Sequence, residues 1–160
     1  MIIFKAIGGV SVVISAIIFY LEIQRYEKTK IDQLDAYISL IEYIKNQIQC
    51  YMLPIDRILY SCDKKILNRC GMQEGTRIKN IEDILLNSNI YLDEECTDEI
   101  IRFSKGFGTS YKSEQINSCN ICRDQLIRYR EASKEKNKKD QKVNLSLCLC
   151  ASLSIILFLI

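Results

Sequence analysis

The apolar and polar residues divide the chain into an apolar stretch at each end and a mixed middle part. Residues 1–23 carry only Lys5 and Glu22 as charged side chains, and residues 143–160 carry none. A helix rises about 1.5 Å per residue and a bilayer core is about 30 Å thick, so about 20 apolar residues can cross it. The pattern predicts a transmembrane helix over each end and a soluble domain over residues 24–142.

Each apolar stretch has one alternative explanation. A cleaved signal peptide could account for the first, but such a peptide has a shorter apolar core and a small-residue cleavage site, and neither occurs before Glu22. A buried core helix could account for the last stretch. Its place at the chain end, next to the lysines between Lys134 and Lys142, favours a membrane span instead.

The middle part begins with the three-and-four spacing of a buried helical face. This stripe runs from Ile31 to Ile48 without Gly or Pro, so the first helix is predicted to continue from the apolar stretch to about Tyr51. Pro54 then fits the first position of a second helix, where its missing N–H costs nothing. Gly71 is predicted to end that second helix.

Three further helices complete the predicted fold. One follows Thr76 and stops at Asn87, and the next has Thr97 as its N-cap. The last runs from Ser113 to Ile160. Because no stretch alternates with a period of two, no strand is predicted. The predicted class is all-α, a helical bundle of five to six helices flanked by N- and C-terminal transmembrane helices.

The charges indicate where the middle domain lies. The chain has 22 Lys and Arg against 20 Asp and Glu, and only Lys5 and Glu22 lie outside residues 24–142. This near balance is not that of a nucleic-acid-binding domain. Basic residues gather beside the apolar ends, as in residues 123–142. The positive-inside tendency therefore predicts a two-pass protein of the cell membrane with a cytoplasmic domain, whose lysines also contact anionic lipid.

The eight cysteines and the absence of histidine limit the chemistry. Without histidine there is no histidine general base, no histidine zinc ligand and no Ser-His-Asp or Cys-His catalysis. Cys148 and Cys150 fall in the last apolar stretch, where they serve as small apolar side chains. The other six cysteines would be reduced in a cytoplasmic domain.

The sharpest motif is Cys119-Asn120-Ile121-Cys122. A CxxC pair can perform thiol redox chemistry or supply half of a zinc site. No βαβ pattern accompanies the motif, and no second CxxC or histidine supplies further ligands. Ile116, Cys119, Cys122, Leu126 and Tyr129 form one helical stripe, so both cysteines are interpreted as core residues. Metal binding and redox chemistry remain the alternatives.

Two weaker motifs give no cofactor site. Residues 106–110 are glycine-rich, but they lack the Walker pattern and are interpreted as a turn between helices. The carboxylates of residues 93–99 lack the spacing of a calcium loop and are interpreted as a solvated or partner-facing surface. No catalytic residue, metal site or cofactor is predicted, and the chain is predicted not to be an enzyme.

The layout resembles the stage III sporulation protein AB family, in which terminal membrane helices enclose a helical domain of this size. Gln33-Leu34 begins an apolar helix that leads to Pro54-Ile55, similar to the family's stretch before its Thr-Pro-Leu turn. The segment from Phe103 to Tyr111, with Gln115, resembles the family's Phe-Gly-Lys, Leu-Gly, Ser-Asp and Gln pattern. The long basic helix that enters a terminal hydrophobic span is the third point of resemblance.

This resemblance implies a non-catalytic membrane platform or assembly protein of the mother cell–forespore channel machine, required for spore development. The soluble domain would be similar to the cytoplasmic domains of the type II secretion platform protein. The implied partners are a cytoplasmic sporulation ATPase on the mother-cell side and other membrane subunits, with a homo-oligomer as a further option. The candidate partner-interface residues are Lys105, Gly108, Ser110, Tyr111 and Gln115.

Two other hypotheses stay open at this point. One is a cysteine-based metal or redox membrane protein that uses Cys119 and Cys122. The other is a membrane scaffold outside sporulation.

Overall fold

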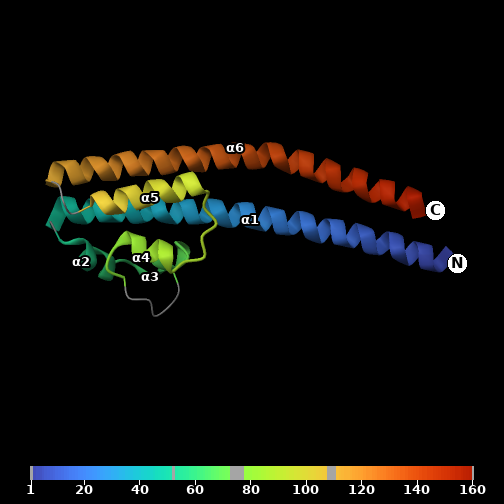
Figure 1. Ribbon diagram of the computed structural model, residues 1–160, viewed down its shortest axis with the longest axis horizontal. Coiled ribbons are helices and arrows are strands. Elements are labelled where there is room, and N and C mark those ends of the chain that lie inside the picture. The colour runs from blue at the N-terminus through green and yellow to red at the C-terminus, as the bar shows by residue number, and fades with distance from the viewer. Residues whose placement is uncertain (1, 52, 73–77, 108–110, 160) are drawn as a thin grey trace. The chain divides into compact units, whose positions relative to one another are not determined.

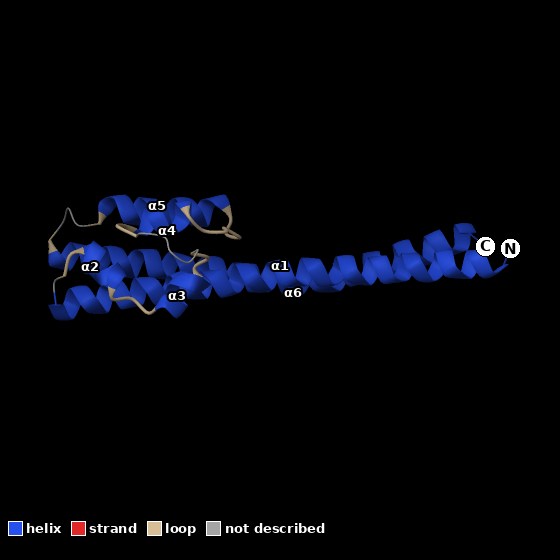
Figure 2. Cartoon of the chain, turned by 90° about the horizontal axis from the view of Figure 1, so that it is seen from below, coloured by secondary structure: helices blue, strands red, loops and turns tan. Residues whose placement is uncertain are grey.

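The computed structural model describes residues 2–51, 53–72, 78–107 and 111–159, and toward both chain ends it describes only some side chains. Six helices follow one another: α1 (Ile2–Tyr51), α2 (Ile55–Tyr60), α3 (Lys64–Arg69), α4 (Ile81–Leu86), α5 (Glu94–Gly106) and α6 (Lys112–Leu159) (Figure 1). Figure 2 draws no strand over these described ranges. Their only β contact is an isolated bridge between Met72 and Ser88. The all-α prediction is confirmed.

The chain divides into two compact units. The first contains residues 1–28 and 133–160, and with them the beginning of α1 and the end of α6. Inside this unit Gln141 donates a hydrogen bond to Gln24, with 3.4 Å between Nε2 and Oε1. The second unit, Thr29–Ala132, holds the remaining helical segments and the main core.

Both predicted membrane spans fall in the first unit. No helix within the described part of the chain carries a stretch long and apolar enough to cross a membrane. The side chains of residues 1–7 and 155–160, which belong to the predicted spans, lie outside what the structure describes. The two spans therefore stay predictions.

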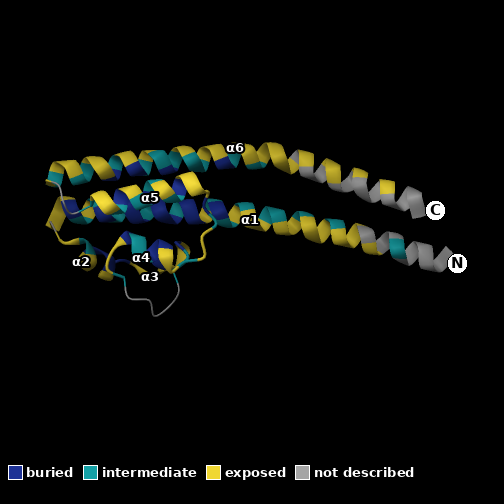
Figure 3. Cartoon of the chain, viewed as in Figure 1, coloured by how far each residue is buried: buried dark blue, intermediate teal, exposed yellow. Residues whose placement is uncertain are grey.

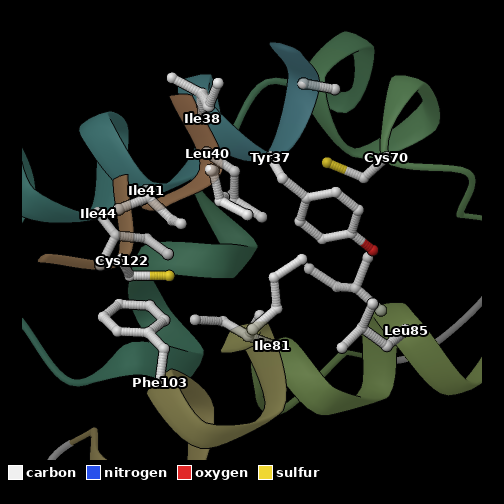
Figure 4. Close-up of a cluster of buried hydrophobic side chains, with 14 of the residues drawn as sticks. Tyr37, Ile38, Leu40, Ile41, Ile44, Cys70, Ile81, Leu85, Phe103 and Cys122 are labelled. Carbon is white, nitrogen blue, oxygen red and sulfur yellow. The ribbon is translucent and has the colours of Figure 1, made fainter. Parts of the chain in front are cut away.

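The core of the second unit is organised around α1. The stripe is confirmed from Leu34 onward, because Leu34, Ile38, Ile41, Ile44 and Ile48 are all buried, whereas Ile31 at its start is only half-buried. Side chains of α2 to α6 complete this core (Figures 3 and 4). Burying each of these large apolar side chains stabilises the fold by about 1.5–3 kcal/mol before the loss of chain entropy is counted.

The prediction of one continuous second helix is wrong. The segment forms two helices, α2 and α3, which are separated by residues 61–63. Asp63 causes the break: its side chain accepts a hydrogen bond from the Lys65 backbone N–H at 2.9 Å and caps a new helix. Pro54 is the N-cap of α2, one position before the predicted place. Gly71 follows α3 with a φ of 98°, as its predicted role at a helix end requires.

Two boundaries of the later helices can also be compared with the prediction. Asn87 is the C-cap of α4, as predicted, and Asn80 opens that helix with a capping box to Asp83. Thr97 is not an N-cap, because α5 begins earlier, after Asp93. The Thr97 hydroxyl instead donates to the Asp93 carbonyl oxygen at 3.1 Å, one turn back within the helix.

Candidate functional site

The second unit has two ends with different chemistry. At the end that we call the base, α1 enters the unit at Thr29 and α6 leaves it at Ala132. At the other end, which we call the tip, α1 ends, α5 ends and α6 begins (Figure 1). Among the described residues the tip consists of 49–51, 53–54, 105–107 and 111–115.

One hydrogen bond joins the two long helices at the tip. The Lys112 ammonium donates to the Gln49 backbone carbonyl at 2.8 Å. The last carbonyls of a helix have no partner within the helix and lie at the negative end of its dipole, so a cation is favourable there. Lys112 thus fixes the beginning of α6 to the end of α1.

The tip exposes large apolar side chains. Tyr111 is 83% exposed, Tyr51 68% and Leu53 39%. Neighbouring exposed apolar side chains on a folded domain often mark a surface that binds another protein. Tyrosine suits such a surface because it offers a large rigid ring and a polar hydroxyl. The tip is therefore the candidate functional site.

The structure accounts for three of the five candidate interface residues. Lys105 is exposed in the last turn of α5, Tyr111 is exposed just before α6, and Gln115 is half-buried in the first turn of α6. Gly108 and Ser110 lie outside the described residues. All three described positions belong to the tip.

Sequence reasoning missed the contribution of α1 to this surface. Tyr51 and Leu53 stand beside Pro54, where the helical stripe of α1 has ended. The sequence does contain a signal for this surface. It is the presence of apolar residues beyond the end of a stripe and next to a helix-breaking proline. Such residues cannot join the buried face of the helix that has just stopped.

The CxxC motif lies in the core. Cys119 is 0% and Cys122 1% exposed, on the α6 face that packs against the rest of the bundle. Burial raises the pKa of Cys119 to about 11 and that of Cys122 to about 12. A protonated buried thiol is a poor nucleophile and a poor metal ligand. Across the described residues, no group of three or more Cys, Asp, Glu or His could hold a metal ion.

The acidic residues 93–99 are partly engaged within the bundle. Lys30, a buried lysine of α1, forms an ion pair with Asp93 at 2.6 Å. Glu99 pairs with Arg102 one turn further along α5 at 2.9 Å. The first pair fixes the start of α5 to α1 at the base, and Arg130 of α6 likewise contacts Asp35 of α1 at 2.8 Å.

A buried glutamine strengthens the base further. Gln33 of α1 is 3% exposed. Its Nε2 donates to the Cys70 carbonyl at 2.8 Å and to the Asn89 carbonyl at 2.9 Å, and its Oε1 accepts from the Tyr91 N–H at 2.8 Å. We call this arrangement the Gln33 clamp. It joins α1 to the segments that follow α3 and α4.

Gly71 makes room for the clamp. A Cβ at this position would lie 2.7 Å from Gln33 Nε2 and 2.9 Å from the Asn89 carbonyl oxygen, which is closer than such atoms can approach. Its φ of +98° also disfavours any L side chain. The base is thus closely braced by ion pairs and the clamp, whereas the tip presents exposed rings.

Comparison with known proteins gives one match. A family model described as stage III sporulation protein AB matches residues 5–160, nearly the whole chain. No curated protein matches, and no solved structure matches.

Proposed function

Because the chain belongs to the stage III sporulation protein AB family, we propose that it is a non-catalytic membrane platform of the machine between mother cell and forespore. The family indicates a role in stage III of sporulation. The proposal adds that the protein anchors or couples a cytoplasmic sporulation ATPase to the membrane subunits. Its domain would face the mother-cell cytoplasm, and residues 1–23 and 143–160 would cross the membrane.

The contrast between tip and base is the observation that carries this proposal. The chain enters and leaves the second unit at the base, and the two apolar stretches continue the sequence from there. Tyr51, Leu53 and Tyr111 are exposed at the opposite end of the same unit. An anchored domain that meets a cytoplasmic partner needs its binding surface away from its points of attachment.

The bracing of the domain supports a mechanical role. The Gln33 clamp and the Lys30–Asp93 pair hold the shorter helices against α1, and Lys112 joins α6 to α1 at the tip. Force applied at the tip would therefore pass to both long helices. Five thiols of this unit are buried. Their burial does not support the alternative of cysteine-based metal or redox chemistry.

Calorimetry with the purified sporulation ATPase tests the proposal. Full-length protein in neutral detergent is expected to bind the ATPase, and Tyr51→Ala with Tyr111→Ala is expected to weaken binding at least tenfold, because exposed tyrosines are frequent hot spots. Tyr60→Ala is the matched control, since Tyr60 is 91% exposed but lies outside the tip. No binding by folded wild-type protein, or equal weakening by the control, would overturn the proposal.

A further inference from the structure

The beginning of α1 has one covered face within the first unit. Ala16, Tyr20, Ile23 and Glu27 are half-buried, and the residues between them, apart from Gln24, are exposed. Their steps of four, three and four residues place them on one side of a helix. The end of α6 is the other helical segment that the structure describes in this unit, and the two segments run side by side in both views (Figures 1 and 2). We infer that α6 covers this face.

The rest of the α1 surface in this unit carries large apolar side chains. Five of them are more than half exposed: Ile14, Ile17, Ile18, Phe19 and Leu21. Leu147 of α6 is exposed to a similar extent. A helix pair in water would bury its largest apolar side chains, whereas helices that pack in lipid often meet through small residues. The covered positions of α1 include two small residues, Gly8 and Ala16.

One hydrogen bond defines how the two helical segments are aligned. The Gln141 amide donates to Gln24, with 3.4 Å between Nε2 and Oε1. Because α1 and α6 run in opposite directions, each step back along α1 corresponds to a step forward along α6. Residue 22 of α1 is therefore level with residue 143 of α6, and residue 6 is level with residue 159.

This alignment brings the charge-free parts of both chain ends to the same level. Residues 6–21 and 143–159 contain no charged residue. Glu22, the charge near the end of the first apolar stretch, is level with Val143, where the second stretch begins. At about 1.5 Å per residue the shared charge-free part is about 24 Å long, which is comparable with the roughly 30 Å of a hydrocarbon core.

We propose that the two apolar ends of one chain cross the membrane as an antiparallel helix pair in this alignment. The covered face of α1 binds α6 of its own chain, and the large exposed side chains face the acyl chains of the lipid. The inference rests on the proposed function, which places residues 1–23 and 143–160 in the membrane. It adds that α1 meets α6 of the same copy rather than of a second copy, so each copy has a complete anchor of its own.

Disulfide crosslinking in isolated membranes tests the pairing. Cys50 and Cys150 are exposed thiols and Cys148 belongs to the same apolar stretch, so all three are first replaced with serine. In this background Gln24→Cys with Gln141→Cys should form a disulfide when copper phenanthroline is added. Tyr20→Cys with Leu145→Cys should do the same, because each of these positions lies four residues deeper in the same alignment. Peptide mass spectrometry identifies the bond, and electrophoresis shows a crosslinked monomer.

Ile18→Cys with Leu147→Cys is the matched control. The two positions are level with each other, but their side chains are 56% and 61% exposed, so they should not crosslink within one chain.

A second arm separates contacts within a chain from contacts between chains. Two differently tagged proteins are produced in the same cells, one with Gln24→Cys and the other with Gln141→Cys. No disulfide between the two tags is expected.

Extraction of the membranes with alkaline carbonate distinguishes failure of the pairing from failure of the membrane anchor. Release of the protein by carbonate would overturn the anchor in the proposed function and this inference with it. If the protein is retained, crosslinks that join different tags would overturn the pairing alone. A control pair that reacts within one chain as readily as the Tyr20 and Leu145 positions, or no crosslink at either predicted pair, would have the same meaning.

Discussion

Replacing Gln33 with alanine removes the centre of the clamp while keeping a good helix-forming residue in α1. The side chain makes three hydrogen bonds, to the Cys70 carbonyl, the Asn89 carbonyl and the Tyr91 N–H. Alanine has no group that can replace any of them. The two segments that follow α3 and α4 would then lose their polar contact with α1.

The expected loss of stability follows from the burial of these bonds. A net contribution of about 1 kcal/mol for each hydrogen bond gives about 3 kcal/mol. The bond to Cys70 is fully buried, so leaving that carbonyl without a donor adds about 1 kcal/mol or more. Water can reach the partly buried Asn89 and Tyr91 groups and limits the loss there. The total of about 4 kcal/mol is large beside a usual stability of about 5–15 kcal/mol.

Urea unfolding of the full-length protein in neutral detergent, followed by circular dichroism, measures the free energy of unfolding. Gln49→Ala is the matched control, because Gln49 is exposed on the same helix and its contact with Lys112 uses the backbone carbonyl. The control should cost less than about 0.5 kcal/mol. Hydrogen exchange gives a local check, since the Tyr91 amide should lose its protection in the Gln33 variant. An unchanged unfolding midpoint together with a protected Tyr91 amide would refute the reasoning.

Three further predictions concern the same unit. Gly71→Ala should destabilise the protein by about 2 kcal/mol or more in urea unfolding, because a Cβ at a φ of 98° strains the backbone and collides with the clamp. Tyr37→Phe should leave stability unchanged or raise it by up to about 1 kcal/mol, because no described atom forms a hydrogen bond with the buried Tyr37 hydroxyl. Ser88 is near enough to affect the pKa of Tyr37 but does not form that bond. Above pH 8.5 stability should fall, because buried thiols such as Cys119, with a pKa of about 11, stay protonated in the folded protein while unfolded thiols ionise near about 8.5. Each such thiol costs about 1.4 kcal/mol one pH unit above that value, and an unfolding midpoint that stays constant to pH 9.5 would contradict this account.

Cys50 offers a test of membrane topology. It is an exposed thiol in the tip, at the end of α1. If the domain is cytoplasmic, a membrane-impermeant maleimide should modify Cys50 in permeabilised cells and leave it unmodified in intact cells. Cys50→Ser is the control, and both proteins carry Cys150→Ser because Cys150 is a second exposed thiol. Modification in intact cells would place the domain on the other side of the membrane.

The spacing of apolar residues predicted the long helices correctly because burial along one face dominates their energetics. The stripe from Leu34 to Ile48 and the core positions of Cys119 and Cys122 follow from that spacing alone. The break between α2 and α3 depends on one side chain, Asp63, whose capping bond competes with a continuous helix. Apolar spacing contains no information on that competition.

The polar interactions of the base were harder to predict. Gln33 belongs to the family pattern, but its hydrogen-bond partners are 37 to 58 residues away in the sequence. A single sequence does not show which backbone groups will be left without partners after the helices pack. For the same reason, the exposure of Tyr51 at the tip became clear only from the fold.

Photo-crosslinking in sporulating cells tests the central claim most directly. A photoreactive amino acid is placed at Tyr111 on the tip and, as the matched control, at Asp32, an exposed position of α1 at the base. A platform that meets its ATPase through the tip should crosslink to the ATPase from Tyr111 and not from Asp32. Crosslinking to the ATPase from Asp32 alone, or from neither position while the protein accumulates normally, would contradict the account.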